Sequence, residues 1–508
     1  MPVETELKLR ISPESLARLK RHALLKSYAV TRPVTRRLYN IYFDTPKLAL
    51  HQARIALRLR RVGRQWIQTL KGGGSIRAGL HQRNEWEVNV RRPELDFTSS
   101  EVDWDAYLPH SLRKKLHPVF VTDFSRSTRI LSYPDGNSGY AEIELCMDQG
   151  QISTQQLGVP LCEIELELKS GNPRQLFELA LEMLEIVPLE LEVVNKAEYG
   201  YRLLSGYTGT PVKAGAPVVA GDEQLDAVLQ MLLWSCLQHL QANLRGAMAS
   251  DDAEYLHQMR VALRRLRVVL RMAEKLHADE QLAALNSEVA ALCNALGKIR
   301  EWDVFIAQTL VPICHRMAGH AGLQAMLANG MRQRAECYVS LRSDSRARDL
   351  QRLILRFSIW MNGSYWTQFG SEAPQARDFA TRRLGKLAER FARAVKETNS
   401  IDAEQLHTVR ILAKKLRYST EFFAGYYHKK HTRSFLEALS SIQEVLGQIN
   451  DVAVAHRLLD EQAGESELAA HQEAITLAKG WIAHDLSDQF AALNKAVKHF
   501  NKQRAFWN

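Results

Sequence analysis

Apolar and polar residues alternate along the chain up to about residue 204, and they follow a helical period after about residue 222. The opening run, VETELKLR, sets Glu4, Glu6 and Lys8 on one side and Leu7 and Leu9 on the other. This division follows because successive side chains of a strand point to opposite faces. Similar short runs are separated by turn-like segments such as KGGGS and YPDGNSG. The pattern predicts a strand-rich N-terminal region.

The helical region contains an internal repeat. The segment LHQMRVALRRLR at 256–267 returns as LHTVRILAKKLR at 406–417, and LGKI at 296–299 returns as LGQI at 446–449. Both pairs of segments are 150 residues apart (406 − 256 and 446 − 296). A period of this length is too long for a solenoid repeat. The repeat predicts two tandem helical bundles.

These patterns divide the chain into three parts. We expect a strand-rich domain over 1–204, a linker over 205–221 and a helical domain over 222–508, with repeats near 222–335 and 375–500. The linker is assigned from its Gly, Pro, Thr and Ala content.

Each predicted strand has a polar face of nearly one sign. Arg58 and Arg60 share a face of one strand, whereas Glu163, Glu165 and Glu167 share a face of another. On a solvated edge strand, which is the alternative interpretation of such a run, opposite charges are usually mixed. Two carboxylates roughly 7 Å apart repel by about 2.4 kcal/mol at an effective dielectric near 20, so the acidic faces favour a bound cation.

The two kinds of strand together suggest phosphate chemistry. Mg²⁺ and Mn²⁺ prefer carboxylate oxygens, while Arg and Lys side chains bind phosphate oxygens. If the sheet closes into a barrel, both sets of charges face one lumen and the apolar faces pack outward. The pattern therefore predicts an inside-out barrel with a metal-assisted phosphoryl-transfer site.

Composition narrows the class of protein. A chain of 508 residues with 46% hydrophobic and 24% charged residues is globular and is expected to form two to four domains. Its six cysteines are scattered without a C-x-x-C pair, and the most apolar stretch is interrupted by polar residues, so we expect a cytoplasmic protein without a signal peptide or membrane partner. The net charge of +10 favours a polyanionic partner.

The strand motifs resemble a known family. ETELKLR is similar to the E-x-E-x-K signature of the CYTH superfamily, the triphosphate tunnel metalloenzymes, and YFDT, ALRLR, TLK and EIELELKSG follow in that family's order. Within the superfamily, the chain most resembles bacterial inorganic triphosphatases that join a CYTH domain to a CHAD domain. The resemblance implies an α+β multidomain protein, with an N-terminal eight-stranded antiparallel β-barrel and C-terminal all-α duplicated helical bundles. It also implies hydrolysis of inorganic triphosphate to pyrophosphate and phosphate with Mg²⁺ or Mn²⁺.

The same resemblance implies roles for tunnel residues. The expected metal ligands are Glu4, Glu6, Asp148, Glu163, Glu165 and Glu167. The expected phosphate-binding residues are Lys8, Arg58, Arg60, Lys71, Arg126 and Lys196. Glu6, Lys8 and Glu167 are the expected catalytic residues. Three assignments stay open: Glu163 could displace its neighbouring carboxylates in register, Glu85 and Glu87 compete for one family position, and Arg129 competes with Arg126.

Two helices of the repeat carry basic stripes. Histidine and basic residues recur at spacings of three and four, which places them on one helix face. A solvated basic face is the alternative, and a metal site is disfavoured because no second ligand lies at a suitable spacing. The stripes resemble the CHAD domain, which implies a groove that binds inorganic polyphosphate through His257, Arg260, Arg264, Arg267, His407, Arg410, Lys414 and Arg417.

Two other functions remain open. The same tunnel could act on thiamine triphosphate, ATP or an RNA 5′-triphosphate. The chain could also be a non-catalytic polyphosphate-binding scaffold. A nucleic-acid partner is not expected, since no base-recognition motif accompanies the charged strands.

Overall fold

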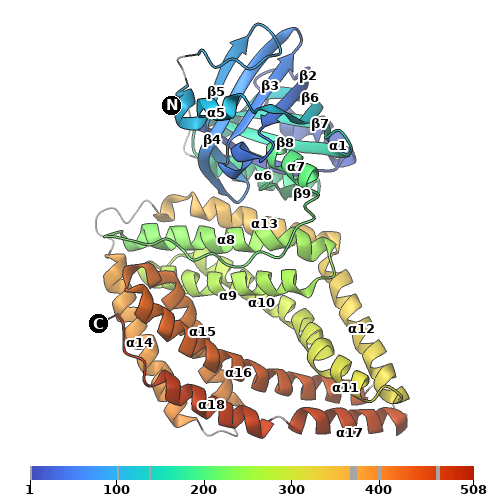
Figure 1. Cartoon of the computed structure of the whole chain (residues 1–508), viewed down its shortest axis with the longest axis vertical. Coiled ribbons are helices and arrows are strands. Elements are labelled where there is room, and N and C mark those ends of the chain that lie inside the picture. The colour runs from blue at the N-terminus through green and yellow to red at the C-terminus, as the bar shows by residue number, and fades with distance from the viewer. Residues whose placement is uncertain are drawn as a thin grey trace. The chain divides into compact units, whose positions relative to one another are not determined.

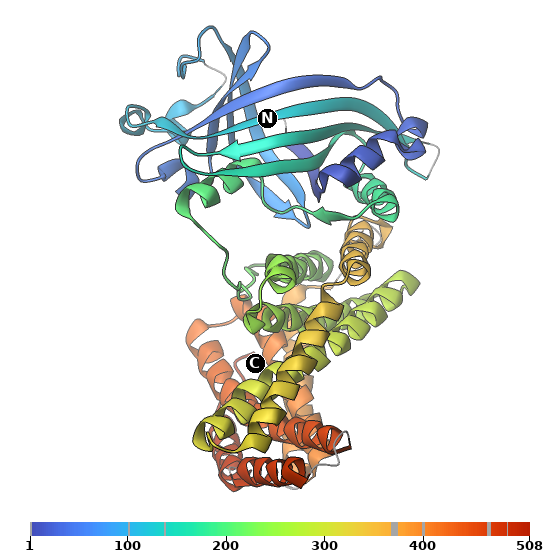
Figure 2. The same ribbon diagram turned by 90° about the vertical axis from the view of Figure 1, so that its right-hand side faces the viewer.

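The computed structural model describes residues 3–99, 102–136, 139–366, 374–398, 402–464, 469–484 and 486–507. The chain forms two compact units (Figure 1; Figure 2). The first comprises Met1–Thr210 and Asp344–Tyr365, and the second comprises Pro211–Ser343 and Trp366–Asn508.

The first unit is built on a closed β-barrel. Its strands are β1 (Val3–Ile11), β2 (Val34–Asp44), β3 (Ala56–Val62), β4 (Gln65–Arg77), β5 (Leu80–Val90), β6 (His117–Pro134), β7 (Tyr140–Ser153) and β8 (Gly158–Ser170). They pair antiparallel in the order β5-β4-β3-β2-β6-β7-β8-β1, and β1 pairs with β5 to close the ring. A short strand, β9 (Leu189–Leu191), adds to β1. The predicted eight-stranded antiparallel barrel is confirmed.

The alternation of the first strand explains how the barrel is covered. Leu7 and Leu9 are fully buried, and the neighbouring Glu6 and Lys8 line the interior cavity. The apolar side of β1 therefore faces outward, where α6 (Pro173–Ile186) packs on it. The expected inside-out arrangement is confirmed, because charged residues occupy the interior and apolar residues the outer layer.

Further helices complete the first unit. They are α1 (Pro13–Arg21), α2 (Ala23–Ser27), α3 (Ala49–Gln52), α4 (Trp104–Tyr107), α5 (His110–Arg113), α7 (Lys196–Ser205) and α13 (Asp344–Met361). Helix α13 packs against α6 although its sequence lies within 222–508. Arg352 forms a two-pronged ion pair with Glu185 at 2.8 and 3.0 Å, and the Gln351 side chain accepts a hydrogen bond from the Leu191 amide at 3.1 Å.

The second unit is helical. Its helices are α8 (Leu225–Ala249), α9 (Ala253–Leu276), α10 (Glu280–Phe305), α11 (Val311–Arg316), α12 (Ala321–Leu341), α14 (Ala376–Glu397), α15 (Ala403–Phe423), α16 (Lys429–Gly464), α17 (Ala469–His484) and α18 (Leu486–Phe500). The repeat motifs lie on α9 and α15, each packed between two neighbours: α8 and α10 for α9, and α14 and α16 for α15 (Figure 1). Within the described residues, no helix combines the length and apolar character needed to cross a membrane.

Helix α7 brings Lys196 to the barrel interior. Asn195 caps this helix by accepting a hydrogen bond from the Glu198 amide, so Lys196 is its first residue. A Cβ atom on Gly200 would lie 2.2 Å from the ring of Phe120 on β6. Glycine therefore allows α7 to approach the barrel wall closely enough for Lys196 to reach the interior.

This close approach gives a prediction. Gly200→Ala should lower the free energy of unfolding by about 1–3 kcal/mol, because the added methyl group overpacks the contact with Phe120. Gly158→Ala is the matched control, since a Cβ there would meet its nearest atom at 3.8 Å. Urea unfolding of both variants measures the difference. Equal stability of the two variants would contradict the proposed contact.

Candidate functional site

The barrel encloses a cavity of about 300 Å³. Residues of β1, β3, β4, β6, β8 and α7 line it, together with side chains from the remaining strands. The predicted site residues in its wall are Glu4, Glu6, Lys8, Arg58, Arg60, Lys71, Arg126, Glu165, Glu167 and Lys196. Residues distant in sequence are thus collected around one enclosed space.

Two predicted metal ligands lie behind the cavity wall. Asp148 is fully buried and Glu163 is 2% exposed, and neither lines the cavity. The Lys196 ammonium lies 2.7 Å from Asp148 and 2.8 Å from Glu165, and it also pairs with Glu163. Arg126 binds both oxygens of Asp148, at 2.8 and 2.6 Å. This cluster is held together by its own cations.

The acidic wall is a row across three strands. In the strand register Glu6 lies opposite Glu167, and Glu167 lies opposite Glu144. All three line the cavity. The pKa of Glu167 is raised by burial, which outweighs its ion pair with Lys169, and Glu4 and Glu144 raise it further. The row therefore carries excess negative charge, and its carboxylate oxygens fit a hard divalent cation.

The opposite side of the cavity is basic. Lys71 lies 2.5 Å from Glu4 and 3.0 Å from Glu85, and Arg58 lies 3.6 Å from Glu85. The pKa of Arg60 falls to about 10 because of burial and then because of the positive charges of Arg58 and Arg126. Because Arg58 and Arg126 repel the charge of Arg60, an added negative charge beside Arg60 would be stabilised.

Lys8 lines the cavity beside two carboxylates of the acidic wall. Burial opposes its charge, but Glu165 and Glu6 outweigh that effect and raise its pKa. Its ammonium lies 2.9 Å from Glu6 and also pairs with Glu165. Lys8 therefore stays protonated at neutral pH and can contact an anion in the cavity.

The structure separates the alternatives left open by sequence. Glu85 and Glu87 both line the cavity. Arg126 lines it too, whereas Arg129 donates instead to the Leu25 carbonyl at 3.4 Å. Three charged lining residues, Glu144, Arg83 and Lys169, were not among the predicted site residues. Alternation was the available signal, because Arg83 shares a face with Glu85 and Glu87, and Lys169 continues the face of Glu165 and Glu167.

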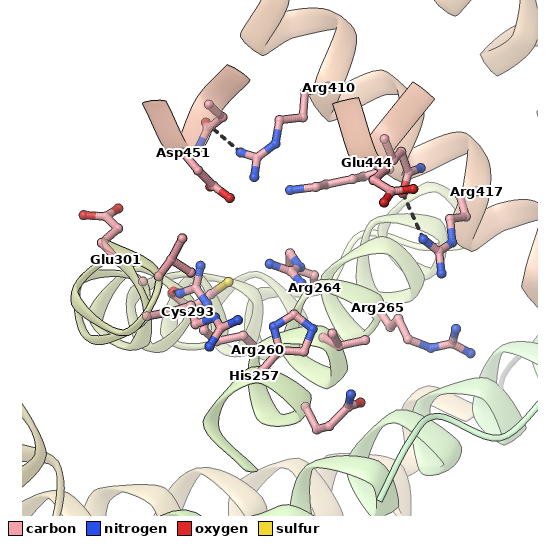
Figure 3. Close-up of a pocket in the computed structure, with 18 of the residues that line it drawn as sticks. His257, Arg260, Arg264, Arg265, Cys293, Glu301, Arg410, Arg417, Glu444 and Asp451 are labelled. Atoms are coloured by element: carbon pink, nitrogen blue, oxygen red, sulfur yellow. Dashed lines mark hydrogen bonds between the residues drawn. The ribbon is translucent and has the colours of Figure 1, made fainter. Parts of the chain in front are cut away.

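A second cavity, of about 1490 Å³, lies within the helical unit. Arg260 and Arg264 reach into it from α9, and Arg410 and Arg417 reach into it from the facing side (Figure 3). His257, His407 and Lys414 also line it. The predicted polyphosphate-binding residues that line this cavity are therefore His257, Arg260, Arg264, His407, Arg410, Lys414 and Arg417.

One member of the predicted stripe lies elsewhere. Arg267 does not line the cavity, and it contributes with Arg271 to lowering the pKa of Lys415, after the effect of burial. Arg265 lines the cavity instead, where it pairs with Glu421. The cavity therefore ends before the stripe does.

The cations of the helical cavity are incompletely neutralised. Among the described residues, no acceptor reaches the buried Nε atoms of Arg260, Arg264 and Arg410. The pKa of Lys414 falls to about 7, first because of burial and then because of Arg410, Arg264 and Arg260. The pKa of His257 falls to about 4 through burial and the charge of Arg300. An anionic ligand would supply the missing negative charge.

Comparison with known families matches two domains to the chain. The CYTH domain family matches residues 2–201, and the CHAD domain family matches residues 231–460. This chain is a CYTH–CHAD protein. The barrel with its charged interior is the CYTH domain, and the helical repeats form the CHAD domain.

Three relatives illustrate the similarity. The CYTH–CHAD chain is 31% identical over 204 residues to the inorganic triphosphatase of Haemophilus influenzae, across 39% of this chain and 54% of that protein. It thus spans about half the length of that relative. An uncharacterized Mycobacterium tuberculosis protein is 25% identical over 85% of this chain and 84% of its own length. The crystal structure of the CHAD domain from the plant Ricinus communis matches with a TM-score of 0.52 and 31% identity, covering 58% of this chain and 98% of that one.

The buried cluster of the CYTH domain gives a second prediction. Lys196→Met should lower the free energy of unfolding by about 3 kcal/mol or more at pH 8, because it leaves buried carboxylates without their counter-charge. The deficit should shrink toward pH 5. Burial already raises the pKa of Glu163 to about 7, and a carboxyl whose pKa is raised on folding regains stability as the pH falls through that value.

Lys169→Met is the matched control for this experiment. Lys169 lies on the face of β8 that carries Glu165 and Glu167, but its side chain is 36% exposed. Loss of an exposed ion pair costs about 1 kcal/mol or less. Urea unfolding at pH 5 and pH 8 measures all three proteins, and a Lys196→Met deficit equal at both pH values would contradict the account.

Proposed function

We propose that the CYTH domain hydrolyses inorganic triphosphate to pyrophosphate and phosphate with Mg²⁺ or Mn²⁺. The observation that carries this proposal is the enclosed cavity in which a row of carboxylates faces a set of arginines and lysines. The similarity to the Haemophilus influenzae inorganic triphosphatase lies in the same part of the chain and supports it. Carboxylates and cations around one cavity suit a metal-bound polyphosphate anion.

Size favours a compact substrate over a nucleotide. The cavity, at about 300 Å³, is at the lower end of the range for small-molecule sites. Its wall is dominated by charged side chains and offers little apolar surface for a base. Inorganic triphosphate is therefore favoured over ATP or thiamine triphosphate, which need room and contacts for an organic group.

The proposed phosphate contacts come from several strands. Lys8, Arg58, Arg60, Lys71, Arg126 and Lys196 would bind the triphosphate oxygens. Several of these cations pair with carboxylates in the structure, so a bound triphosphate would replace those carboxylates as their partner. Their fixed positions would stabilise charge on the transferred phosphoryl group and on the pyrophosphate leaving group.

The proposed metal ligands belong to the acidic wall. Glu4, Glu6, Glu165 and Glu167, with Glu144 beside them, offer carboxylate oxygens to the cavity. A bound divalent ion would neutralise phosphate charge and lower the pKa of a water molecule. Glu6 or Glu167 would orient the attacking water. Asp148 and Glu163, which the resemblance includes among the ligands, are placed to hold Lys196 in position.

We further propose that the CHAD domain binds inorganic polyphosphate. Its cavity brings cations from α9 and α15 to two sides of one space, and their charge is incompletely neutralised. A linear polyanion offers repeated phosphates to such a surface and requires neither base nor sugar contacts. A catalytically silent polyphosphate scaffold is the competing function, and the complete set of tunnel charges argues against it.

The hydrolytic proposal leads to a third prediction. Purified protein should release phosphate from inorganic triphosphate faster than from ATP or thiamine triphosphate, and only with added Mg²⁺ or Mn²⁺.

Glu6→Gln should reduce turnover by roughly a hundredfold or more, because it removes a ligand of the ion that activates water. Glu142→Gln is the control, because Glu142 lies on the same face of β7 as Glu144 but is exposed and outside the cavity. Faster turnover of an organic triphosphate would reassign the substrate, and absence of all turnover would support the scaffold.

The CHAD cavity leads to a fourth prediction, on pH. Lys414 faces Arg260, Arg264, Arg410 and Asp451, and its pKa is about 7 without ligand. A bound polyanion would favour its charged form, so binding takes up a proton above that pH. Polyphosphate affinity should therefore fall about tenfold between pH 6 and pH 8.

A permanently charged side chain at the same position tests the cause. Lys414→Arg should flatten this pH dependence, whereas His257→Gln should retain most of it, because burial and the charge of Arg300 lower the pKa of His257 to about 4, below this pH range. Fluorescence titration with polyphosphate of defined length at one salt concentration measures each profile. A profile that is unchanged in Lys414→Arg would contradict the role of Lys414.

A further inference from the structure

The C-terminal part of the predicted linker is attached to the helical unit at two points. The sequence predicted a linker over 205–221, and residues 212–219, here called the strap, lie against the helical unit at both ends. These residues belong to the second compact unit. The strap is therefore a part of the helical unit.

The first attachment is made by two buried side chains of α8. Asn243 is fully buried and binds the backbone of Val212 twice, with its amide oxygen accepting from the Val212 amide and its amide nitrogen donating to the Val212 carbonyl, both at 2.9 Å. His239 adds a third contact to the same carbonyl at 3.0 Å. The His239 ring also lies 3.1 Å from the side chain of Gln258, which lines the cavity. This end of the strap is fixed to the first repeat.

The second attachment lies beyond the second repeat helix. Val219 is 2% exposed, and a Cβ atom on Gly425 would lie 2.1 Å from its carbonyl oxygen. Just after the strap, Glu223 accepts hydrogen bonds from the Ala220 amide and from the Tyr426 hydroxyl. Gly425 and Tyr426 belong to the 3₁₀ turn Ala424–Tyr426, which follows α15. The strap therefore joins the two repeats.

Between its two attachments the strap forms part of the cavity wall. Lys213, Ala214, Gly215 and Ala216 line the same 1490 Å³ space as Arg264 and Arg410. Lys213 is exposed, so its ammonium adds positive charge at this side.

We propose that the strap is one wall of the polyanion site and that Lys213 contacts a bound phosphate chain. This inference rests on the proposed binding of polyphosphate by the CHAD domain. It adds a contact from outside the two basic stripes, supplied by a segment whose composition alone indicates only a linker.

Salt dependence of binding isolates the Lys213 contact. Each phosphate contact displaces about one counterion, so Lys213→Ala should reduce the slope of log affinity against log salt by roughly one. The same loss corresponds to about fivefold weaker binding at 0.15 M salt. Lys275→Ala is the matched control, since Lys275 is an exposed lysine at the end of α9 outside the cavity.

A second pair of variants tests the contact between the strap and Gly425 without changing any charge. Gly425→Ala should push Val219 from its position and weaken binding to a similar extent as Lys213→Ala. Gly480→Ala is the control, because a Cβ there meets no atom within 4 Å. Both variants are made in the full-length protein, which is titrated with polyphosphate of defined length.

The outcomes separate the two proposals. Weaker binding and a reduced salt slope in Lys213→Ala and Gly425→Ala, but not in the controls, would support the strap. Wild-type affinity and slope in both test variants would overturn the strap while leaving polyphosphate binding in place. Absence of polyphosphate binding by the wild-type protein would overturn the proposed CHAD function and the strap with it.

Discussion

The interior of the barrel depends on the pairing of buried charges. An isolated ion loses most of its hydration in such a place, and only opposite charges at close distance compensate for this loss. Lys196 and Lys8 contact four carboxylates between them on the neighbouring strands β1, β7 and β8, and Arg126 contacts two of the same group. Because strands hold these groups at fixed register, the cavity is preorganised for a ligand that also carries charge of both kinds. A metal-bound triphosphate has this character.

The CHAD cavity differs because its cations lie near one another and are not all paired with carboxylates. Its cations face one another, so that Lys414 and Arg260 have lowered pKa values, of about 7 and about 10, through burial and mutual repulsion. In the CYTH interior the charges form ion pairs, so a ligand must break these pairs to bind. In the CHAD cavity some positive charge is unpaired, so an anionic ligand can neutralise it directly. The first arrangement favours selective binding of a small substrate. The second favours a long polyanion.

Much of this arrangement could be predicted from the sequence. Period-two alternation placed Glu6, Lys8 and Glu165 in one lumen, and the 150-residue repeat placed Arg260 and Arg410 on equivalent helices. Both predictions depend on local periodicity, which the fold preserves. Alternation gives the face of a strand but not the depth along it, so it could not separate Glu163, behind the wall, from Glu167, within it.

The remaining features depend on contacts between distant segments. Arg267 shares the stripe of Arg264, yet the cavity ends before it. The packing of α13 on α6 and the seating of the strap on Asn243 and Gly425 involve residues far apart in sequence. No local pattern of the chain records such contacts.

Electron paramagnetic resonance of Mn²⁺ bound to the full-length protein tests the central claim most directly, because it observes the ion at the acidic wall. The account predicts a bound-ion spectrum in the wild-type protein that changes when triphosphate is added. It predicts a free-ion spectrum under the same conditions when Glu6 and Glu167 are both replaced by glutamine. A bound-ion spectrum that survives both substitutions, or one that triphosphate leaves unchanged, would contradict it.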